Sequence, residues 1–182
     1  MNHTVAFFSD IHGVPETLKF FLQQADRLGA ETLVLLGDAL YHGPRNGVPH
    51  AYDPKEVARI LNDNKERILA VRGNCDSDVD QMMLEFPIMA EYSQLLTPTR
   101  RFFLTHGHLY HKDYLPPLPK GAVFAQGHTH LPALEELPSG ITFLNPGSIS
   151  LPKGGFPPTF ALLQEDGTLT LRTLQDGEVF QP

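Results

Sequence analysis

Five short apolar segments of this chain are each followed, within three residues, by aspartate, asparagine or histidine. The residues in question are Asp10 and His12, Asp38, Asn74 with Cys75 and Asp76, His106, and the pair His128 and His130. In an α/β protein, the ends of neighbouring strands meet at one edge of the sheet and build a site there. This repeated pattern, an apolar segment followed by polar residues, therefore predicts an α/β fold that brings residues distant in sequence together at strand ends.

The histidine pair lies in the segment Gly127-His128-Thr129-His130, just after the apolar residues 122–125. Alternate side chains of an extended segment point to the same face, so His128 and His130 can present ring nitrogens to a common site. One such pair is weak evidence, because polar residues after a strand usually form solvated turns. Five groups of this kind in one chain favour a shared site over five unrelated turns.

The side chains in this set are the types that bind divalent metal ions. Carboxylates, imidazoles and the asparagine amide oxygen are accepted by Mn, Fe, Zn or Ni, and the lack of a thiolate favours Mn or Fe. The seven candidate ligands are Asp10, His12, Asp38, Asn74, His106, His128 and His130. Seven ligands are too many for one ion, so we expect two divalent ions that share a bridging carboxylate, most simply Mn²⁺, with Fe, Zn or Ni as alternatives.

The ordered motifs D-x-H, G-D, G-N-C-D, H-G-H and G-H-T-H resemble those of the calcineurin-like metallophosphoesterases. The pattern of that family is D-x-H, G-D, G-N-H-[D/E], H and G-H-x-H, and the resemblance extends from Asp10 to the turn at residues 145–148. Within the family, the small size and the segments 41–46 and 152–155 are similar to the YfcE-type bacterial phosphodiesterases. The resemblance implies a four-layer αββα sandwich, in which two mixed sheets pack face to face and are flanked by helices.

The resemblance also implies how the site is divided. It assigns Asp10, His12 and His130 to one metal ion and Asn74, His106 and His128 to the other, with Asp38 bridging both. In this arrangement two ions polarise a phosphodiester and bind a shared water as hydroxide for in-line attack, without a covalent intermediate. Asp38, Asn74 and His106 are then the expected catalytic residues, and Asn74 also orients the phosphate.

The chain departs from the family pattern at Cys75, where many members have a histidine that is thought to protonate the leaving group. A thiol with an ordinary pKa of about 8.5 is a poor substitute for an imidazolium. His108 is an alternative residue in the same cleft, or else a solvated loop histidine. Arg45 can form a bidentate phosphate contact, or else a surface or subunit contact. With Asn74, these residues are the candidates for substrate binding, and the loop at Lys153 is a weaker one.

Elements of secondary structure follow from hydrophobic periodicity. We expect strands at residues 5–9, 32–36, 68–71, 101–105 and 122–125, and helices at 15–28 and 54–62, the latter capped by Asp53. Residues 141–144, 159–163 and 169–173 are expected to form a second, mainly antiparallel sheet, with a hairpin turn at 164–167. Residues 77–96 are ambiguous apart from a short helical stretch at 79–86.

Length and charge limit the class of protein. The 182 residues are most simply one domain, residues 1–182, and the net charge of −7 argues against broad binding to nucleic acid or anionic membranes. No apolar run is long enough to span a bilayer, and the start of the sequence lacks the pattern of a signal peptide. With a single cysteine, Cys75, this predicts a cytoplasmic protein. The expected partner is a small phosphodiester substrate, and the sequence leaves open a homo-oligomer.

Two alternatives belong to other functional classes. A retromer subunit with the same fold serves as a protein-binding scaffold and has lost metal-ligand residues, whereas this sequence keeps the whole set. A phosphomonoesterase or protein phosphatase would need groups that bind two free phosphate charges, or a peptide groove. The organic part of the substrate is not readable from the sequence.

Overall fold

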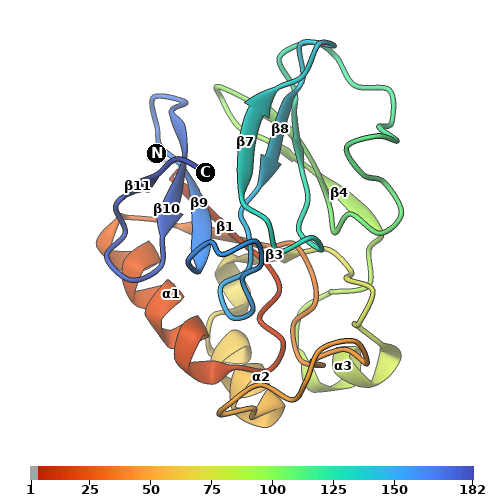
Figure 1. The fold of residues 1–182 in the computed structure, drawn as a ribbon, viewed down its shortest axis with the longest axis vertical. Helices are drawn as coiled ribbons and strands as arrows, with labels where there is room; N and C mark the ends of the chain where they lie inside the picture. Colours follow the sequence, from red (N-terminus) through yellow and green to blue (C-terminus); the bar gives the residue numbers. More distant parts are fainter. Residues whose placement is uncertain (1–3) are drawn as a thin grey trace.

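The computed structural model describes residues 4–182, in which two mixed β-sheets pack face to face (Figure 1). The first sheet has the strand order β11-β10-β9-β1-β2-β3 and the second has the order β4-β5-β6-β8-β7. The strands are β1 (Val5–Phe8), β2 (Thr32–Leu35), β3 (Ile68–Ala70), β4 (Tyr92–Leu96), β5 (Arg101–Thr105), β6 (Val123–Ala125), β7 (Ala133–Glu136), β8 (Thr142–Asn145), β9 (Thr159–Leu163), β10 (Leu169–Thr173) and β11 (Val179–Phe180). The centres of both sheets are parallel, through β1–β2–β3 and through β5–β6–β8.

Helices cover the outer face of the first sheet. They are α1 (Pro15–Arg27) and α2 (Pro54–Asp63). The 3₁₀ turn η1 (Lys65–Arg67) and the short α3 (Asp78–Met83) follow along the chain and contribute no buried side chain. As the sequence predicts, α2 begins at a capping residue, because the Asp53 carboxylate accepts a hydrogen bond from the Glu56 amide at 3.0 Å. Buried side chains of α1 and α2, such as Phe21 and Leu61, pack against the strands and leave the strand ends free.

Three apolar clusters separate the layers. In β1, Phe8 faces the helices and stacks on Phe21 with ring centroids 4.1 Å apart, whereas Phe7 faces the second sheet and stacks on Phe102 at 5.0 Å. This alternation follows from the two-residue period of a strand, and both faces of β1 are buried. The outer face of the second sheet, around Phe124, is covered by the loop at residues 106–121 in the part of the chain described.

The sandwich of two mixed sheets confirms the predicted fold class, but one detail of the prediction was wrong. Residues 159–163 and 169–173 do not form the second sheet with residues 141–144; they extend the first sheet as β9, antiparallel to β1, and β10, antiparallel to β9. Strand character can be read from local sequence, but the strand with which a segment pairs depends on long-range packing. The turn between β9 and β10 is a hairpin as predicted, closed by a 2.9 Å hydrogen bond from the Gln164 amide to the Thr168 carbonyl.

Three further strands were not predicted, and all three lie at sheet edges. These are β4, β7 and β11, whose side chains are mostly half-buried or exposed, so their sequences lack an apolar run. Residues 79–86, expected to be helical, overlap α3, which begins at Asp78 and ends at Met83; the prediction was wrong for residues 84–86, where the backbone becomes extended at Leu84. Within residues 4–182, none of the helices combines the length and the apolar character needed to cross a bilayer.

Candidate metal centre and active site

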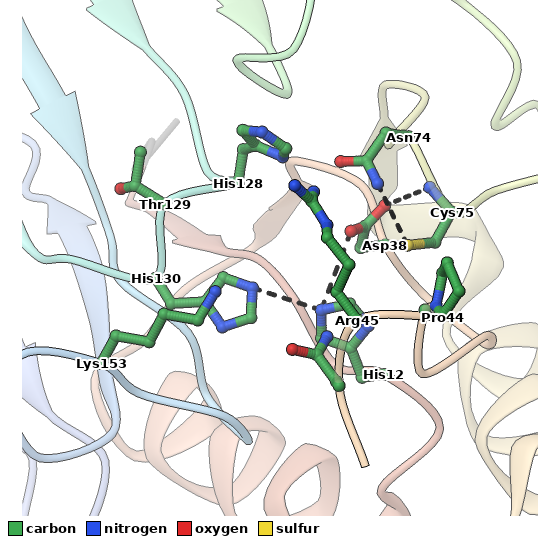
Figure 2. A pocket seen from close by; sticks show the side chains of 12 residues that line it. His12, Asp38, Pro44, Arg45, Asn74, Cys75, His128, Thr129, His130 and Lys153 are labelled. Carbon is green, nitrogen blue, oxygen red and sulfur yellow. Dashed lines mark hydrogen bonds and ion pairs between the residues drawn. The ribbon is translucent and has the colours of Figure 1, made fainter. Parts of the chain in front are cut away.

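The seven predicted ligands come together where strands of both sheets end. Asp10 and His12 follow β1, Asp38 follows β2, Asn74 follows β3, His106 follows β5, and His128 and His130 follow β6. Figure 2 shows several of them around one cavity, with His12, His130 and Asp38 near its floor. The structure therefore gathers the whole set that the sequence singles out.

The backbone at these positions is unusual. Five of the seven residues have a left-handed conformation: Asp10 (φ 57°), His12 (49°), Asp38 (56°), His128 (68°) and His130 (61°). A conformation of this kind costs about 1 kcal/mol or more for a non-glycine residue and persists only where the surroundings impose it. Here the backbone amides of Asp10 and His12 donate to the carbonyls of Gly37 and Asp38, both at 3.1 Å. Concentrated strain of this type is characteristic of functional sites.

One group of ligand atoms surrounds Asp10. Its Oδ1 lies 3.2 Å from His130 Nε2 and 3.6 Å from His12 Nε2, and the two imidazole nitrogens are 3.3 Å apart. Ligand atoms that share an ion at about 2.1 Å lie about 3.0–3.4 Å from one another. Asp10 Oδ1 is also fully buried and accepts no hydrogen bond of good geometry from the described residues. A divalent cation would satisfy it, so the group fits a metal ion.

A second group surrounds His106. Its Nε2 lies 3.1 Å from Asn74 Oδ1, 3.2 Å from His128 Nδ1 and 3.4 Å from Asp38 Oδ2. The same Asp38 oxygen is 3.7 Å from His12 Nε2, which belongs to the first group. Asp38 therefore faces both groups, and these spacings also suit a shared ion.

Backbone carbonyls orient three of the imidazoles. His12 Nδ1 lies 2.8 Å from the Tyr41 carbonyl. His106 Nδ1 lies 2.6 Å from the Leu36 carbonyl, and His130 Nδ1 lies 2.5 Å from the Leu151 carbonyl. A carbonyl only accepts, so each neutral ring carries its proton on Nδ1 and leaves the Nε2 lone pair toward the cluster. This is the tautomer that a metal ligand requires.

Burial and charge shift the pKa values within the cluster. Burial alone would raise the pKa of Asp10 and Asp38, but neighbouring imidazoles outweigh it and lower both values. Burial alone would lower the pKa of His106, but the adjacent carboxylates raise it to about 9. The pKa of His128 is lowered to about 4 by burial and by the charge of His106. Near neutral pH the carboxylates are therefore ionised, and His106 holds a proton that a metal ion would displace.

Asp76 supports the cluster in a way the sequence analysis missed. Its carboxylate is 3% exposed and accepts hydrogen bonds from three backbone amides, those of Asp38 (2.9 Å), Ala39 (2.9 Å) and Gly73 (2.7 Å). It thereby fastens the end of β2 to the loop after β3. Gly73 allows this close approach, since a Cβ there would lie 2.1 Å from Asp38 Oδ1. The sequence signal was only that an acid follows Cys75.

The turn after β8 holds the histidine segment in place. Asn145 donates from Nδ2 to the Gly127 carbonyl and to Thr129 Oγ1, both at 2.9 Å, and Ser148 donates to the Asp10 carbonyl at 2.8 Å. At Gly127 a Cβ would lie 2.0 Å from Ser9 Oγ, so only glycine fits between the two strand ends. The segments that contribute Asp10 and the histidine pair are therefore fastened to each other through buried polar contacts.

A cavity of about 360 Å³ opens over the cluster, and two of the residues lining it are cations, Arg45 and Lys153. Figure 2 shows Arg45 directed into the cavity on the side of Asn74 and His128, with Lys153 beside His130. No carboxylate among the described residues is within ion-pair distance of either cation. The cavity of this acidic protein therefore has a positive rim suited to an anion.

The remaining candidate residues have different positions. Cys75 lines this cavity beside Asn74, and burial together with the charge of Asp38 raises the pKa of its thiol above the ordinary value. His108 does not line it; this residue lies in a neighbouring cavity that also contacts His128, and burial and His106 lower its pKa. A role for His108 toward substrate therefore stays a prediction.

Comparison with known proteins identifies the family. A model of the calcineurin-like phosphoesterase superfamily domain matches residues 3–168. The chain belongs to the calcineurin-like phosphoesterase superfamily. It is 47% identical to phosphodiesterase YfcE of Escherichia coli K12 over 173 residues, which cover 95% of this chain and 93% of that protein. The predicted resemblance is thus confirmed.

Two solved structures are similar to this chain. The structure of YfcE, a phosphoesterase from E. coli, matches with a TM-score of 0.94 and 45% identity, over 98% of this chain and 97% of that chain. Wild-type Vps29 from Entamoeba histolytica, solved with Zn²⁺, matches with a TM-score of 0.58 and 22% identity, over 97% and 96%. The second likeness concerns the fold alone.

Proposed function

We propose that this calcineurin-like phosphoesterase is a phosphodiesterase that uses two divalent ions, and that Mn²⁺ is the preferred ion. Asp10, His12 and His130 would hold one ion, and Asn74, His106 and His128 the other, with Asp38 shared between them. The name of the E. coli relative, phosphodiesterase YfcE, supports a phosphodiester as the substrate. The single cysteine supports a cytoplasmic location.

The observation that carries the proposal is the position of Asp38 between the two groups of ligand atoms. One carboxylate oxygen lies 3.4 Å from His106 Nε2 and 3.7 Å from His12 Nε2. The other accepts a 2.8 Å hydrogen bond from the Cys75 amide, which keeps the carboxylate from rotating. A buried, ionised carboxylate held in this way is suited to bridge two cations.

Two bound ions would neutralise phosphate charge and lower the pKa of a water molecule so that it attacks as hydroxide. The protein supplies the positioning. Asn74 Oδ1 faces His106, whereas Nδ2 faces the Cys75 side of the cavity and is available to a phosphate oxygen. Arg45 and Lys153 at the rim add charge-assisted contacts to the phosphate. The leaving group departs as the P–O bond breaks, and the Cys75 thiol is a poor proton donor to it because its pKa is raised.

The two alternatives are separated by what the cavity contains. A scaffold protein has no need of the complete ligand set with its strained backbone, so its retention argues for an enzyme. Two free cations at the rim are compatible with a monoester as well as a diester, so the choice between these substrates needs a direct comparison.

The test uses protein stripped with a chelator and reloaded with Mn²⁺, Fe²⁺, Zn²⁺ or Ni²⁺. We expect hydrolysis of bis(4-nitrophenyl) phosphate to return with metal, fastest with Mn²⁺, and to exceed that of 4-nitrophenyl phosphate. Asp166→Asn, at an exposed turn, is the control for the effects of stripping and reloading the metal, and it should behave like the parent. Faster turnover of the monoester, or no turnover with any of the four ions, would contradict the proposal.

A further inference from the structure

A second cavity, of about 600 Å³, adjoins the one above the ligand cluster. The two cavities have four lining residues in common: Pro44, Arg45, Asn74 and Cys75. The two cavities are therefore adjacent, and these four residues form the wall that they share. The volume lies within the range of about 300–1,000 Å³ that is usual for small-molecule sites.

We propose that this second cavity, here called the arm cavity, binds one ester arm of the substrate, and that the arm is a flat, uncharged ring system. The inference rests on the proposed phosphodiesterase function and adds the chemical class of the organic group. A phosphate over the ligand cluster would have its two ester oxygens directed away from the ions. Because the arm cavity lies directly across the shared wall, the organic group on one of these ester oxygens would lie in it.

Part of the wall of the arm cavity is aromatic and apolar. Tyr41 and Tyr52 both line it, and His42 packs between them with ring centroid distances of 4.7 Å and 5.2 Å. Tyr52 is held firmly against Gly13, where an added Cβ would lie 2.3 Å from its ring. Rigid aromatic side chains of this kind bind planar groups by stacking at low entropic cost.

An exposed apolar side chain adds to this lining. Val79, in the first turn of α3, is 67% exposed although it lines the cavity, and Tyr41 is 41% exposed. Exposed apolar groups that meet around a pocket next to a reaction site are the expected lining for an apolar part of a ligand. Their exposure is thus explained by a substrate that covers them.

Charge argues against a second phosphate in the arm cavity. Asp80 lies in its wall, where its carboxylate accepts hydrogen bonds from the Ser77 amide (2.7 Å) and hydroxyl (2.8 Å) in the cap of α3. Arg45, the cation among the lining residues, lies in the shared wall, where the diester phosphate itself would be. A further anionic group on the arm would face Asp80 without a cation of its own.

The arm cavity is also mechanically linked to the ligand cluster. Tyr41 contributes its side chain to the cavity and its carbonyl to His12 Nδ1, 2.8 Å away. The ring that would stack on the arm and the imidazole that would hold an ion are thus fixed by the same residue. The arm therefore helps to set the position of the phosphate.

The experiment compares two inhibitors that cannot be hydrolysed, diphenylphosphinate and dimethylphosphinate. Both carry one negative charge and two P–C bonds, and they differ only in their rings, so the ratio of their inhibition constants reports on ring binding. We expect the Mn²⁺-loaded parent to prefer the diphenyl compound by at least about 10-fold, as stacking and burial of one ring suggest. Val79→Asp and Tyr41→Ala should bring the ratio close to one.

Val48→Asp is the matched control. Val48 is the same residue type, is also 67% exposed, and lines neither cavity. Its substitution should leave the ratio as in the parent. Because the control adds the same charge at a residue that lines neither cavity, it separates a specific contact with the ring from a general effect of the added charge.

A second readout does not depend on turnover. The chain contains no tryptophan, so Val79→Trp and Val48→Trp would each carry a single indole. Diphenylphosphinate should change the emission of the first protein and not that of the second, and dimethylphosphinate should change neither.

The outcomes distinguish the two proposals. If diesters are hydrolysed but the parent ratio is near one, or Val79→Asp keeps a high ratio, the arm cavity does not bind the ring and this inference is overturned. If no diester is hydrolysed and neither phosphinate binds, the proposed function fails and this inference fails with it. A high parent ratio that is lost in Val79→Asp and Tyr41→Ala, but kept in Val48→Asp, supports the assignment.

Discussion

The Asp76 carboxylate accepts a 2.9 Å hydrogen bond from the Asp38 backbone amide. Asp76 is buried outside the cavity, and through this bond it fixes the position of Asp38, which faces the cavity. Burial and the charge of Asp38 raise the pKa of Asp76, and the three amides that donate to it offset this cost. The two carboxylates therefore have different tasks, although they lie on neighbouring loops.

Replacement of Asp76 tests this division. Asp76→Asn keeps the shape but turns one acceptor oxygen into a donor that faces backbone amides, so we expect it to destabilise the fold by about 1–3 kcal/mol. Metal content and kcat should fall with the displaced Asp38, and KM should change less. Urea unfolding, metal analysis and steady-state kinetics measure the three effects. Asp78→Asn, two residues away and exposed, should be close to the parent; equal effects of both substitutions would contradict a positioning role.

Loss of the shared carboxylate should affect both ions at once. Asp38→Asn is expected to abolish hydrolysis and to reduce bound metal from about two ions per chain to almost none, because a neutral amide cannot hold two dications together. His130→Ala is the informative comparison, since His130 contacts only the Asp10 group and should cost about one ion. Elemental analysis after dialysis gives the counts. Near-normal turnover in Asp38→Asn would remove that residue from the bridging role.

The pH dependence of metal binding follows from His106. Its pKa is raised to about 9 from 6.5, so in the metal-free fold the protonated ring contributes stability that is fully present below about pH 6.5 and lost as the pH rises through about 9. A metal ion needs the neutral ring and must displace this proton, so affinity should increase with pH up to about 9. NMR titration of the metal-free protein should find His106 titrating near 9 and His128 near 4.

Calorimetry provides an independent check of the same proton. Mn²⁺ binding near pH 7 should release the proton of His106, together with any proton on His12, whose pKa, despite burial, the Asp10 carboxylate also raises, and the release should vanish above about pH 9. Titrations in buffers with different ionisation enthalpies measure the number of protons released. Binding near pH 7 without any proton release would show that His106 is already neutral.

The clustering of the seven candidate ligands could be predicted from sequence because it depends on local features. An apolar strand followed by Asp10 or Asp38 is visible in a few residues, and the period of two in an extended segment relates His128 to His130. The parallel centres of both sheets then bring the strand ends together. Helix α2 was equally predictable, since its capping residue and proline are adjacent in the chain.

Other features depend on contacts between distant segments and were not predictable. The carbonyls that orient His12, His106 and His130 lie 29, 70 and 21 residues away, and any residue type can supply a carbonyl. The addition of β9 and β10 to the first sheet is a similar case, because many partners suit an apolar strand. The burial of Asp76 likewise follows from the fold and not from its neighbours in sequence.

Cys75 is the position at which this chain departs from the family pattern, and its surroundings make it a weak acid. Burial and the charge of Asp38 raise the pKa of its thiol, so the thiol stays protonated and gives up its proton reluctantly. Leaving groups should therefore depart mainly through their own acidity. Aryl diesters should be hydrolysed much faster than alkyl diesters, with a steep dependence of rate on the pKa of the leaving group.

Restoring a histidine at this position should reduce that dependence. Cys75→His places an imidazolium near the shared wall of the two cavities and is expected to accelerate poor leaving groups by up to about 10²–10⁴-fold, with little change for good ones. Cys75→Ala is the control and should keep most activity on aryl substrates, since the backbone amide of residue 75, which donates to Asp38, is unaffected. Rates measured for a series of leaving groups in the parent and both variants give the slopes. A shallow slope in the parent, or an inactive Cys75→Ala that still binds metal, would show that the thiol takes part in the reaction.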